Sequence, residues 1–241
     1  IDGRVGGDDV LDNIFGLGSS DIFEKVKRIQ IVACGTSLHA GRVAANWFSS
    51  ISELPTQIDN ASEYRYRNPH VDEDSLLVTI SQSGETADTL AALRHAAPGE
   101  FIASLVIANV DNSSLVRESD FKFLTRAGTE IGVASTKAFT TQLVALLMLT
   151  IALGRRRGMS EAQQQALIDG LRALPDLVDP RRGTVVRAMA IEGLTVPRIR
   201  AAAKHSGGYA ALLQTLELGS RGVELTRGER LALATAAISS S

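Results

Sequence analysis

Cysteine is nearly absent from this sequence, in which Cys34 is the single one among 241 residues. One cysteine excludes an internal disulfide, and the four histidines are scattered along the chain without the spacing of a metal-binding motif. We therefore expect neither a disulfide nor a metal site. Because Cys34 closes an apolar run, we expect it to be a small core residue and not a nucleophile.

An excess of charge is lacking as well. The formal net charge is −2, and the lysines and arginines are spread along the chain instead of forming a basic stripe. Proteins that bind nucleic acid concentrate positive charge on one face or along one helix. The sequence therefore argues against nucleic acid as a partner.

The sequence also lacks an apolar run long enough to cross a membrane. The strongest candidate extends over residues 143–153, interrupted only by Thr150, whereas a span needs about 20 residues. We expect this run to be a buried helix. No export signal is recognisable near the first residue. The sequence thus predicts a cytoplasmic protein without a membrane partner, and its 44% of hydrophobic residues suffice for a sizeable core.

Apolar runs of strand length alternate with helical patterns. Two of the patterns begin near residues 36 and 86, and a third is expected from about residue 135 to residue 154. Several of the runs are apolar enough to be buried on both faces, as in parallel sheets covered by helices. We predict a three-layer α/β domain around a central, mostly parallel five-stranded sheet. Its expected strands are residues 28–33, 56–60, 76–80, 104–109 and 121–125.

Hydroxyl side chains gather in two turns that follow apolar runs: CGTS at residues 34–37, and SQSGET at residues 81–86. In a parallel sheet the strand carboxyl ends and the next helix N-termini meet at one edge, where unpaired N–H groups attract a phosphate. The alternative is that the hydroxyls only cap their helices, which is the commoner use of Ser and Thr there. The candidate ligands are Thr36, Ser37, Ser81, Gln82, Ser83 and Thr86.

Three motifs together resemble a known family. CGTS, SQSGETADTL and GTEIGVASTKAFTTQ are similar to the sugar isomerase (SIS) fold and, in this combination, to the isomerase part of the glutamine–fructose-6-phosphate aminotransferases. ASEYRYR and NSSLVRESD strengthen the closer resemblance, which covers roughly residues 1–180. The resemblance implies that the chain is the first SIS subdomain of such an enzyme.

The family's activity follows as an expectation. These transaminases (isomerizing) take ammonia from glutamine and pass it to fructose 6-phosphate, which yields glucosamine 6-phosphate for amino-sugar synthesis. The resemblance implies that fructose 6-phosphate or glucosamine 6-phosphate binds at the two turns, with Val133 and Ser135 lining the sugar end of the pocket. It also implies a homodimer. We expect no cofactor.

Catalytic residues are left unassigned. Glu130 and Lys137 flank the GVAST loop and could move protons, but a solvated charge or a helix-cap interaction is the commoner use of such residues. Lys204 and His205 have neighbours that do not match the family. The family's glutaminase domain and second SIS subdomain have no match here, so we expect this chain alone to bind the sugar phosphate without converting it.

Four segments are predicted along the chain. Residues 1–27 are a linker and lead-in helix, 28–158 the SIS sugar-phosphate-binding domain, 159–180 an amphipathic helix, and 181–241 a C-terminal region that does not match the family. The alternative function is a non-catalytic, sugar-phosphate-sensing SIS module. A nucleotide-binding protein is disfavoured because the chain has no G-x-x-x-x-G-K-[ST] motif.

Overall fold

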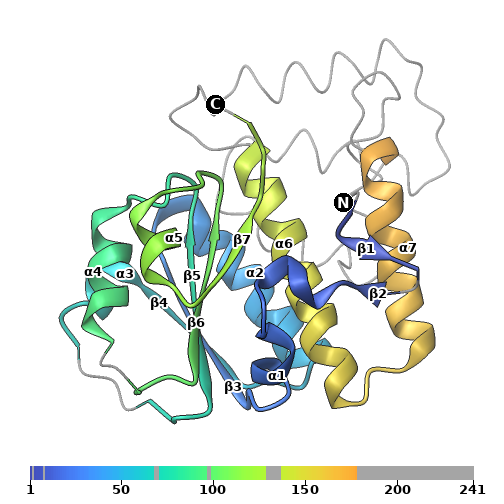
Figure 1. Ribbon diagram of the computed structural model, residues 1–241, viewed down its shortest axis with the longest axis horizontal. Coiled ribbons are helices and arrows are strands. Elements are labelled where there is room, and N and C mark those ends of the chain that lie inside the picture. The colour runs from blue at the N-terminus through green and yellow to red at the C-terminus, as the bar shows by residue number, and fades with distance from the viewer. Residues whose placement is uncertain (2, 8, 68–70, 97–98, 129–136, 178–241) are drawn as a thin grey trace, which may run out of the picture. The chain divides into compact units, whose positions relative to one another are not determined.

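The computed structural model describes residues 1, 3–7, 9–67, 71–96, 99–128 and 137–177 (Figure 1). The chain divides into two compact units, Ile1–Ile168 and Asp169–Ser241. Of the second unit, only residues 169–177 are described. The fold below is that of the first unit.

Five parallel strands form the central sheet, in the order β4-β3-β5-β6-β7. All four neighbouring pairs are parallel, which confirms the predicted five-stranded parallel sheet. Each strand end lies within one residue of its predicted position. Strand β5, which is buried along its whole length, extends one residue further than predicted at each end. The strands are β3 (Arg28–Ala33), β4 (Thr56–Asn60), β5 (Ser75–Ser81), β6 (Ala103–Ala108) and β7 (Phe121–Leu124).

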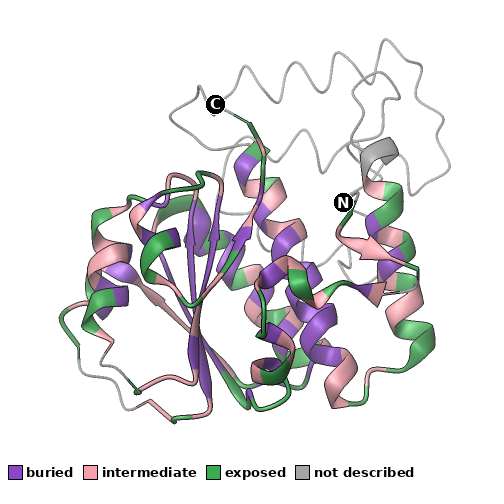
Figure 2. Cartoon of the chain, in the orientation of Figure 1, coloured by how far each residue is buried: buried purple, intermediate pink, exposed green. Residues whose placement is uncertain are grey.

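Helices cover the two faces of the sheet. Helices α2 (Gly35–Ile51) and α6 (Lys137–Gly154) pack together on one face, and α3 (Ala61–Tyr64), α4 (Ala87–His95) and α5 (Ser114–Glu118) cover the other (Figure 1). Figure 2 shows buried residues along the central strands and on the helix sides that face them. The three-layer α/β architecture is therefore confirmed.

Close packing fixes α2 on its face of the sheet. A Cβ at Gly41 would lie 2.9 Å from Ile31 Cγ2 and 2.9 Å from Ile58 Cδ1. On the opposite face, Val32 and Leu77 pack with Leu93 and their neighbours in a second cluster of buried residues. Alternate residues of β3 thus enter two different apolar layers, which is why the strand is apolar along most of its length.

Helix α6 is a buried helix, as the sequence predicted. Twelve of its 18 residues are buried. Together with the following turn it reaches 21 residues, long and apolar enough to cross a membrane by length and composition alone. Because 67% of its most apolar window is buried inside the protein, the helix has the character of a core helix.

The N-terminal segment packs against the rest of the first unit. It consists of β1 (Val5–Gly6), β2 (Asp9–Val10), the 3-10 helix η1 (Asp12–Phe15) and α1 (Ser19–Phe23). Ion pairs join Arg155 to Asp9 and Arg156 to Asp12, so the short 3-10 helix η2 (Arg155–Arg157) holds this segment.

Helix α7 (Glu161–Leu177) follows η2. Ser160 Oγ accepts a hydrogen bond from the Gln163 backbone N–H at 3.2 Å, and the Ser160 N–H donates to Gln163 Oε1 at 3.2 Å. This reciprocal pair is a capping box with Ser160 as the N-cap. The boundaries between the four predicted segments stay predictions.

Candidate functional site

The two hydroxyl-rich turns lie side by side at the carboxyl edge of the sheet. Strands β3 and β5 are neighbours, and Ala33 is the register partner of Ile80. The next residues along each strand, Cys34 and Ser81, therefore start the two turns about 4.8 Å apart, which is the spacing of adjacent strands. This neighbourhood depends on the strand order, in which β5 pairs with β3 although β4 lies between them in the sequence.

The first turn leads directly into α2. Cys34 is the extended N-cap residue, and Gly35 follows with φ +57°, a conformation that glycine adopts without strain. Within the described residues no side chain caps this helix start. Thr36 is exposed and Ser37 is 6% exposed. The first turn of α2 thus presents backbone N–H groups and one accessible hydroxyl at the edge of the sheet.

The second turn is built by its own hydroxyls. The buried Ser81 Oγ accepts a hydrogen bond from the Gly84 N–H at 3.0 Å and shares another with Thr86 Oγ1 at 2.8 Å. Ser83 Oγ accepts from the Glu85 N–H at 3.1 Å. These bonds fold residues 81–86 into a compact loop that leads to the first residue of α4.

Gly84 is required by the geometry of this loop. Its φ is +68°, in the left-handed region, and a Cβ there would lie 2.5 Å from Ser113 Cβ. Only glycine meets both conditions without strain. The turn therefore packs tightly on the segment that precedes α5.

Segments behind the second turn hold it in place. The Asn109 N–H donates to the Gln82 carbonyl at 3.1 Å, and the Leu115 N–H donates to the Gly84 carbonyl at 3.1 Å. Glu85 Oε1 accepts from the Ser114 N–H at 2.7 Å. Hydrogen bonds from Ser114 lower the pKa of Glu85 below its ordinary value. Glu85 therefore anchors the turn to α5.

Helix α4 resembles α2 in its start. Thr86 is its N-cap residue, and no side chain caps the helix within the described part of the chain. Asp88 lies in the first turn and Arg94 and His95 in the last, where their charges complement the helix dipole. The positive end of the helix dipole and its unpaired N–H groups therefore point to the same edge as those of α2.

The structure places six of the predicted ligands at this edge. Ser37 and Ser81 are buried, Gln82, Ser83 and Thr86 are half-buried, and Thr36 is exposed. Val133 and Ser135 lie outside the described residues, as do Glu130, Lys204 and His205. Lys137 is the exposed first residue of α6.

Cys34 is half-buried, so our expectation of a core cysteine was only partly right. Its Sγ lies 3.5 Å from Asn60 Oδ1, at the carboxyl end of β4. Among the described residues, no group of three or more His, Cys, Asp or Glu side chains could hold a metal ion.

Sequence reasoning missed three residues that support the turns. Asn109 Oδ1 accepts from Thr125 Oγ1 at 3.1 Å and from the Ala127 N–H at 2.7 Å, which fixes the chain after β7. Ser113 packs against Gly84, and Gln142 Nε2 donates to Ser37 Oγ at 3.0 Å. Ser113 and Gln142 lie in the motifs NSSLVRESD and KAFTTQ, which resemble the family. The resemblance could therefore have pointed to these two residues, whereas no local sequence pattern does.

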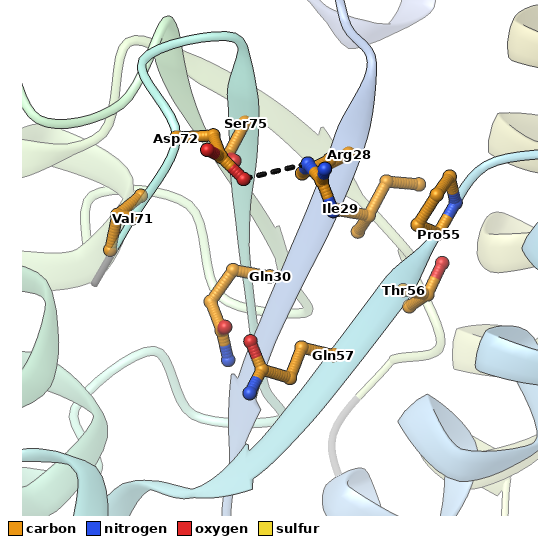
Figure 3. A pocket seen from close by; sticks show the side chains of 9 residues that line it. All are labelled: Arg28, Ile29, Gln30, Pro55, Thr56, Gln57, Val71, Asp72 and Ser75. Atoms are coloured by element: carbon orange, nitrogen blue, oxygen red, sulfur yellow. Dashed lines mark ion pairs between the residues drawn. The ribbon is translucent and has the colours of Figure 1, made fainter. Parts of the chain in front are cut away.

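A pocket of about 250 Å³ lies elsewhere, near the amino ends of β3, β4 and β5. Figure 3 shows Gln30 and Gln57, from neighbouring strands, below an ion pair between Arg28 and Asp72. In parallel α/β sheets ligands bind beyond the carboxyl ends of the strands. The hydroxyl-rich turns, and not this pocket, therefore form the candidate site.

Comparison with protein families agrees with this fold. The model of the SIS domain family matches residues 22–152, more than half of the chain. The chain belongs to the SIS domain family. Its SIS domain holds both hydroxyl-rich turns and most of α6.

Individual curated relatives show a more specific similarity than the family model does. The chain is 58% identical over 175 residues to a glutamine–fructose-6-phosphate aminotransferase (isomerizing) of Idiomarina loihiensis, and 59% identical over 176 residues to that of Pseudomonas putida. Each match covers 73% of this SIS chain but only 29% of the relative. The chain therefore spans less than a third of the length of these relatives.

A solved structure shows the same similarity. The C-terminal domain of glucosamine-fructose-6-phosphate aminotransferase from Francisella tularensis matches with a TM-score of 0.70 and 45% sequence identity. The match covers 73% of this chain and 49% of that one. The SIS fold predicted from the sequence is thereby confirmed.

Proposed function

We propose that this chain is the first SIS subdomain of a glutamine–fructose-6-phosphate aminotransferase and that it binds the sugar phosphate of that reaction. The reaction converts fructose 6-phosphate and glutamine to glucosamine 6-phosphate. The high identity to the aminotransferases supports the reaction class. One structural observation supports the site: two helix starts without a side-chain cap converge with hydroxyls at one sheet edge.

The chemistry of that edge suits a phosphate monoester. Backbone N–H groups at two helix starts and the dipoles of both helices favour an anion. The hydroxyls of Thr36, Ser83 and Thr86 are partly or fully exposed there and can donate to phosphoryl oxygens. A neutral ligand would gain no stabilisation from the helix dipoles. The sugar phosphate is accordingly expected to bind through its phosphate, with the ring directed away from the helix starts.

We further propose that the working protein is a cytoplasmic homodimer. This proposal rests on the family resemblance, because α6 buries its apolar residues within its own unit and offers no separate argument for an interface. That neither nucleic acid nor a membrane is a partner stays a prediction from the composition.

Calorimetric titration with glucosamine 6-phosphate tests the site. Replacing Ser81 and Ser83 together with alanine is expected to weaken binding roughly tenfold or more for each hydrogen bond to the charged phosphate. Because Ser81 and Ser83 both also hydrogen-bond within the turn, the unfolding temperature of each variant is measured together with its affinity. Ser83→Ala should retain the unfolding temperature of the original chain to within a few degrees.

Ser160→Ala is the matched control. It also removes a serine hydroxyl at a helix start, but one whose partner is Gln163. Its affinity should equal that of the original chain. If the folded Ser81→Ala, Ser83→Ala double variant binds glucosamine 6-phosphate as tightly as the control, the proposed site is wrong.

A further inference from the structure

Gln142 is a buried polar residue on an otherwise apolar stretch of α6. Its side chain is 1% exposed, and it follows KAFTT in the motif that carried the family resemblance. The Nε2 atom donates to Ser37 Oγ at 3.0 Å. The Oε1 atom is buried and has no hydrogen-bond partner among the residues that the structure describes. A buried acceptor without a partner costs about 1–3 kcal/mol, so packing alone gives no reason for an amide here.

The hydrogen bond from Gln142 determines what Ser37 can offer to a ligand. A hydroxyl has one hydrogen to donate and two lone pairs that accept. Because Gln142 Nε2 donates to Ser37 Oγ, it occupies a lone pair and leaves the Ser37 proton available. That proton does not serve the start of α2, since a capping hydroxyl accepts from the helix N–H groups and does not donate to them.

An anion at the helix starts needs donors. If the Gln142 amide were turned around, Oε1 would face Ser37 and take its proton, so that an anion would meet only lone pairs of the hydroxyl. With Nε2 facing Ser37, the unpartnered Oε1 stays on the far side of the amide, away from the shared hydrogen bond. The observed orientation is therefore the one that turns Ser37 into a donor.

We propose that Gln142 is a positioning residue of the phosphate site: its Nε2 holds the Ser37 hydroxyl so that this hydroxyl donates to a phosphoryl oxygen. The inference rests on the proposed function. It assigns to α6 the task of orienting a ligand-binding hydroxyl on α2, from a position 105 residues further along the chain.

A double-mutant cycle on the full chain tests the coupling. Gln142→Met keeps the length of the side chain but cannot donate, and Ser37→Ala removes the hydroxyl. With glucosamine 6-phosphate as the titrant, Ser37→Ala should weaken binding roughly tenfold to a hundredfold, and Gln142→Met roughly fivefold to tenfold. In the Ser37→Ala background, Gln142→Met should change the affinity less than about twofold, because the group through which it acts is gone.

Two further variants separate positioning from packing. Gln142→Glu can only accept when ionised, so it should bind the sugar phosphate more weakly than Gln142→Met. Thr150→Val is the matched control on the same helix, because the buried Thr150 hydroxyl bonds only within α6, to the Leu146 carbonyl. Thr150→Val should leave the affinity unchanged. Should Gln142→Met not fold, Gln142→Asn, whose amide falls short of Ser37, carries the same prediction.

The outcomes distinguish this inference from the function on which it rests. Equal losses from Gln142→Met in the presence and absence of the Ser37 hydroxyl would overturn the positioning role and leave the phosphate site standing. So would unchanged affinity in Gln142→Met. If Ser37→Ala binds as tightly as the original, the positioning role is overturned and the phosphate site stands. If the original chain does not bind glucosamine 6-phosphate, both proposals are overturned.

Discussion

Helix α7 and the helices α2 and α4 begin in opposite ways. The start of α7 has a single serine, and Ser160 forms a complete capping box with Gln163. The starts of α2 and α4 are richer in hydroxyls, yet no side chain caps either helix within the described residues. A hydroxyl next to a helix start therefore does not by itself indicate a cap.

The difference lies in the partners of the hydroxyls. Ser37 is bonded by Gln142 from another helix, and Ser81 and Thr86 bond to each other. These bonds leave the first N–H groups of α2 and α4 to a ligand, whereas at the start of α7 the Gln163 N–H is already bonded to Ser160 Oγ. The comparison teaches that Ser81 and Thr86 shape a loop, and that the helix starts themselves are kept open.

The largest expected effect comes from breaking the loop that keeps α4 open. Gly84→Ala combines a left-handed φ of +68° with a Cβ only 2.5 Å from Ser113 Cβ. We expect it to lower the free energy of unfolding by roughly 2–4 kcal/mol, since both the strain and the overlap contribute. Chemical denaturation measures this loss, and sugar-phosphate affinity should fall with it.

Gly99→Ala is the control for the strain alone. Gly99 has φ +85°, but no atom of the described, non-neighbouring residues lies within 4 Å of a Cβ there. It should cost only about 1 kcal/mol. If Gly84→Ala costs no more than Gly99→Ala, the tight packing between the turn and Ser113 does not stabilise the loop.

A smaller effect sharpens the contrast between capped and open helix starts. Ser160→Ala should lower the stability by about 1 kcal/mol and leave the affinity for glucosamine 6-phosphate unchanged. Thr36→Ala, in the first turn of α2, should do the reverse: stability within about 0.5 kcal/mol and weaker binding. Chemical denaturation measures the stability of each variant, and calorimetry measures its affinity for glucosamine 6-phosphate. A stability loss in Thr36→Ala as large as that in Ser160→Ala would show that Thr36 is a cap after all.

The smallest expected effect is a pH dependence at Glu85. Its pKa lies below the ordinary value of 4.5 because Ser114 hydrogen bonds favour the ionised form. The stabilisation is therefore present above pH 4.5 and is lost as the pH falls through the lowered pKa. In Glu85→Gln this contribution is missing, so the stability difference from the original chain should shrink on acidification. Unfolding free energies measured between about pH 6 and about pH 3 test the sign, and a difference that grows in acid would contradict it.

Much of the fold was predictable, because strands that are buried in a parallel sheet are recognisable as short runs of apolar residues. Strands β3 and β4 have the predicted bounds, β5 and β6 differ by one residue at both ends, and β7 differs by one residue at its end. The capping box of Ser160 was predictable for the same reason, since both partners lie within four residues. The edge that carries the two turns followed from the alternation of strands and helices.

Partners that are distant in the sequence were not predictable. Nothing local to Gln142 distinguishes a solvated amide from one that bonds to Ser37, and nothing local to Asn109 indicates that it holds the Gln82 carbonyl. The N-terminal segment is a similar case. Its predicted role as a linker did not foresee the ion pairs of Asp9 and Asp12 with η2.

The sequence by itself determined which residues form the five strands, that two hydroxyl-rich turns follow two of them, and which family the chain resembles. These properties depend on burial patterns and motifs that span a few residues. Only the tertiary structure decided what the hydroxyls do, because a hydroxyl bonds to whichever group packing brings within about 3 Å of it. The packing of α6 on α2 brought Gln142 to Ser37, and the fold of the turn brought Ser81 to Thr86.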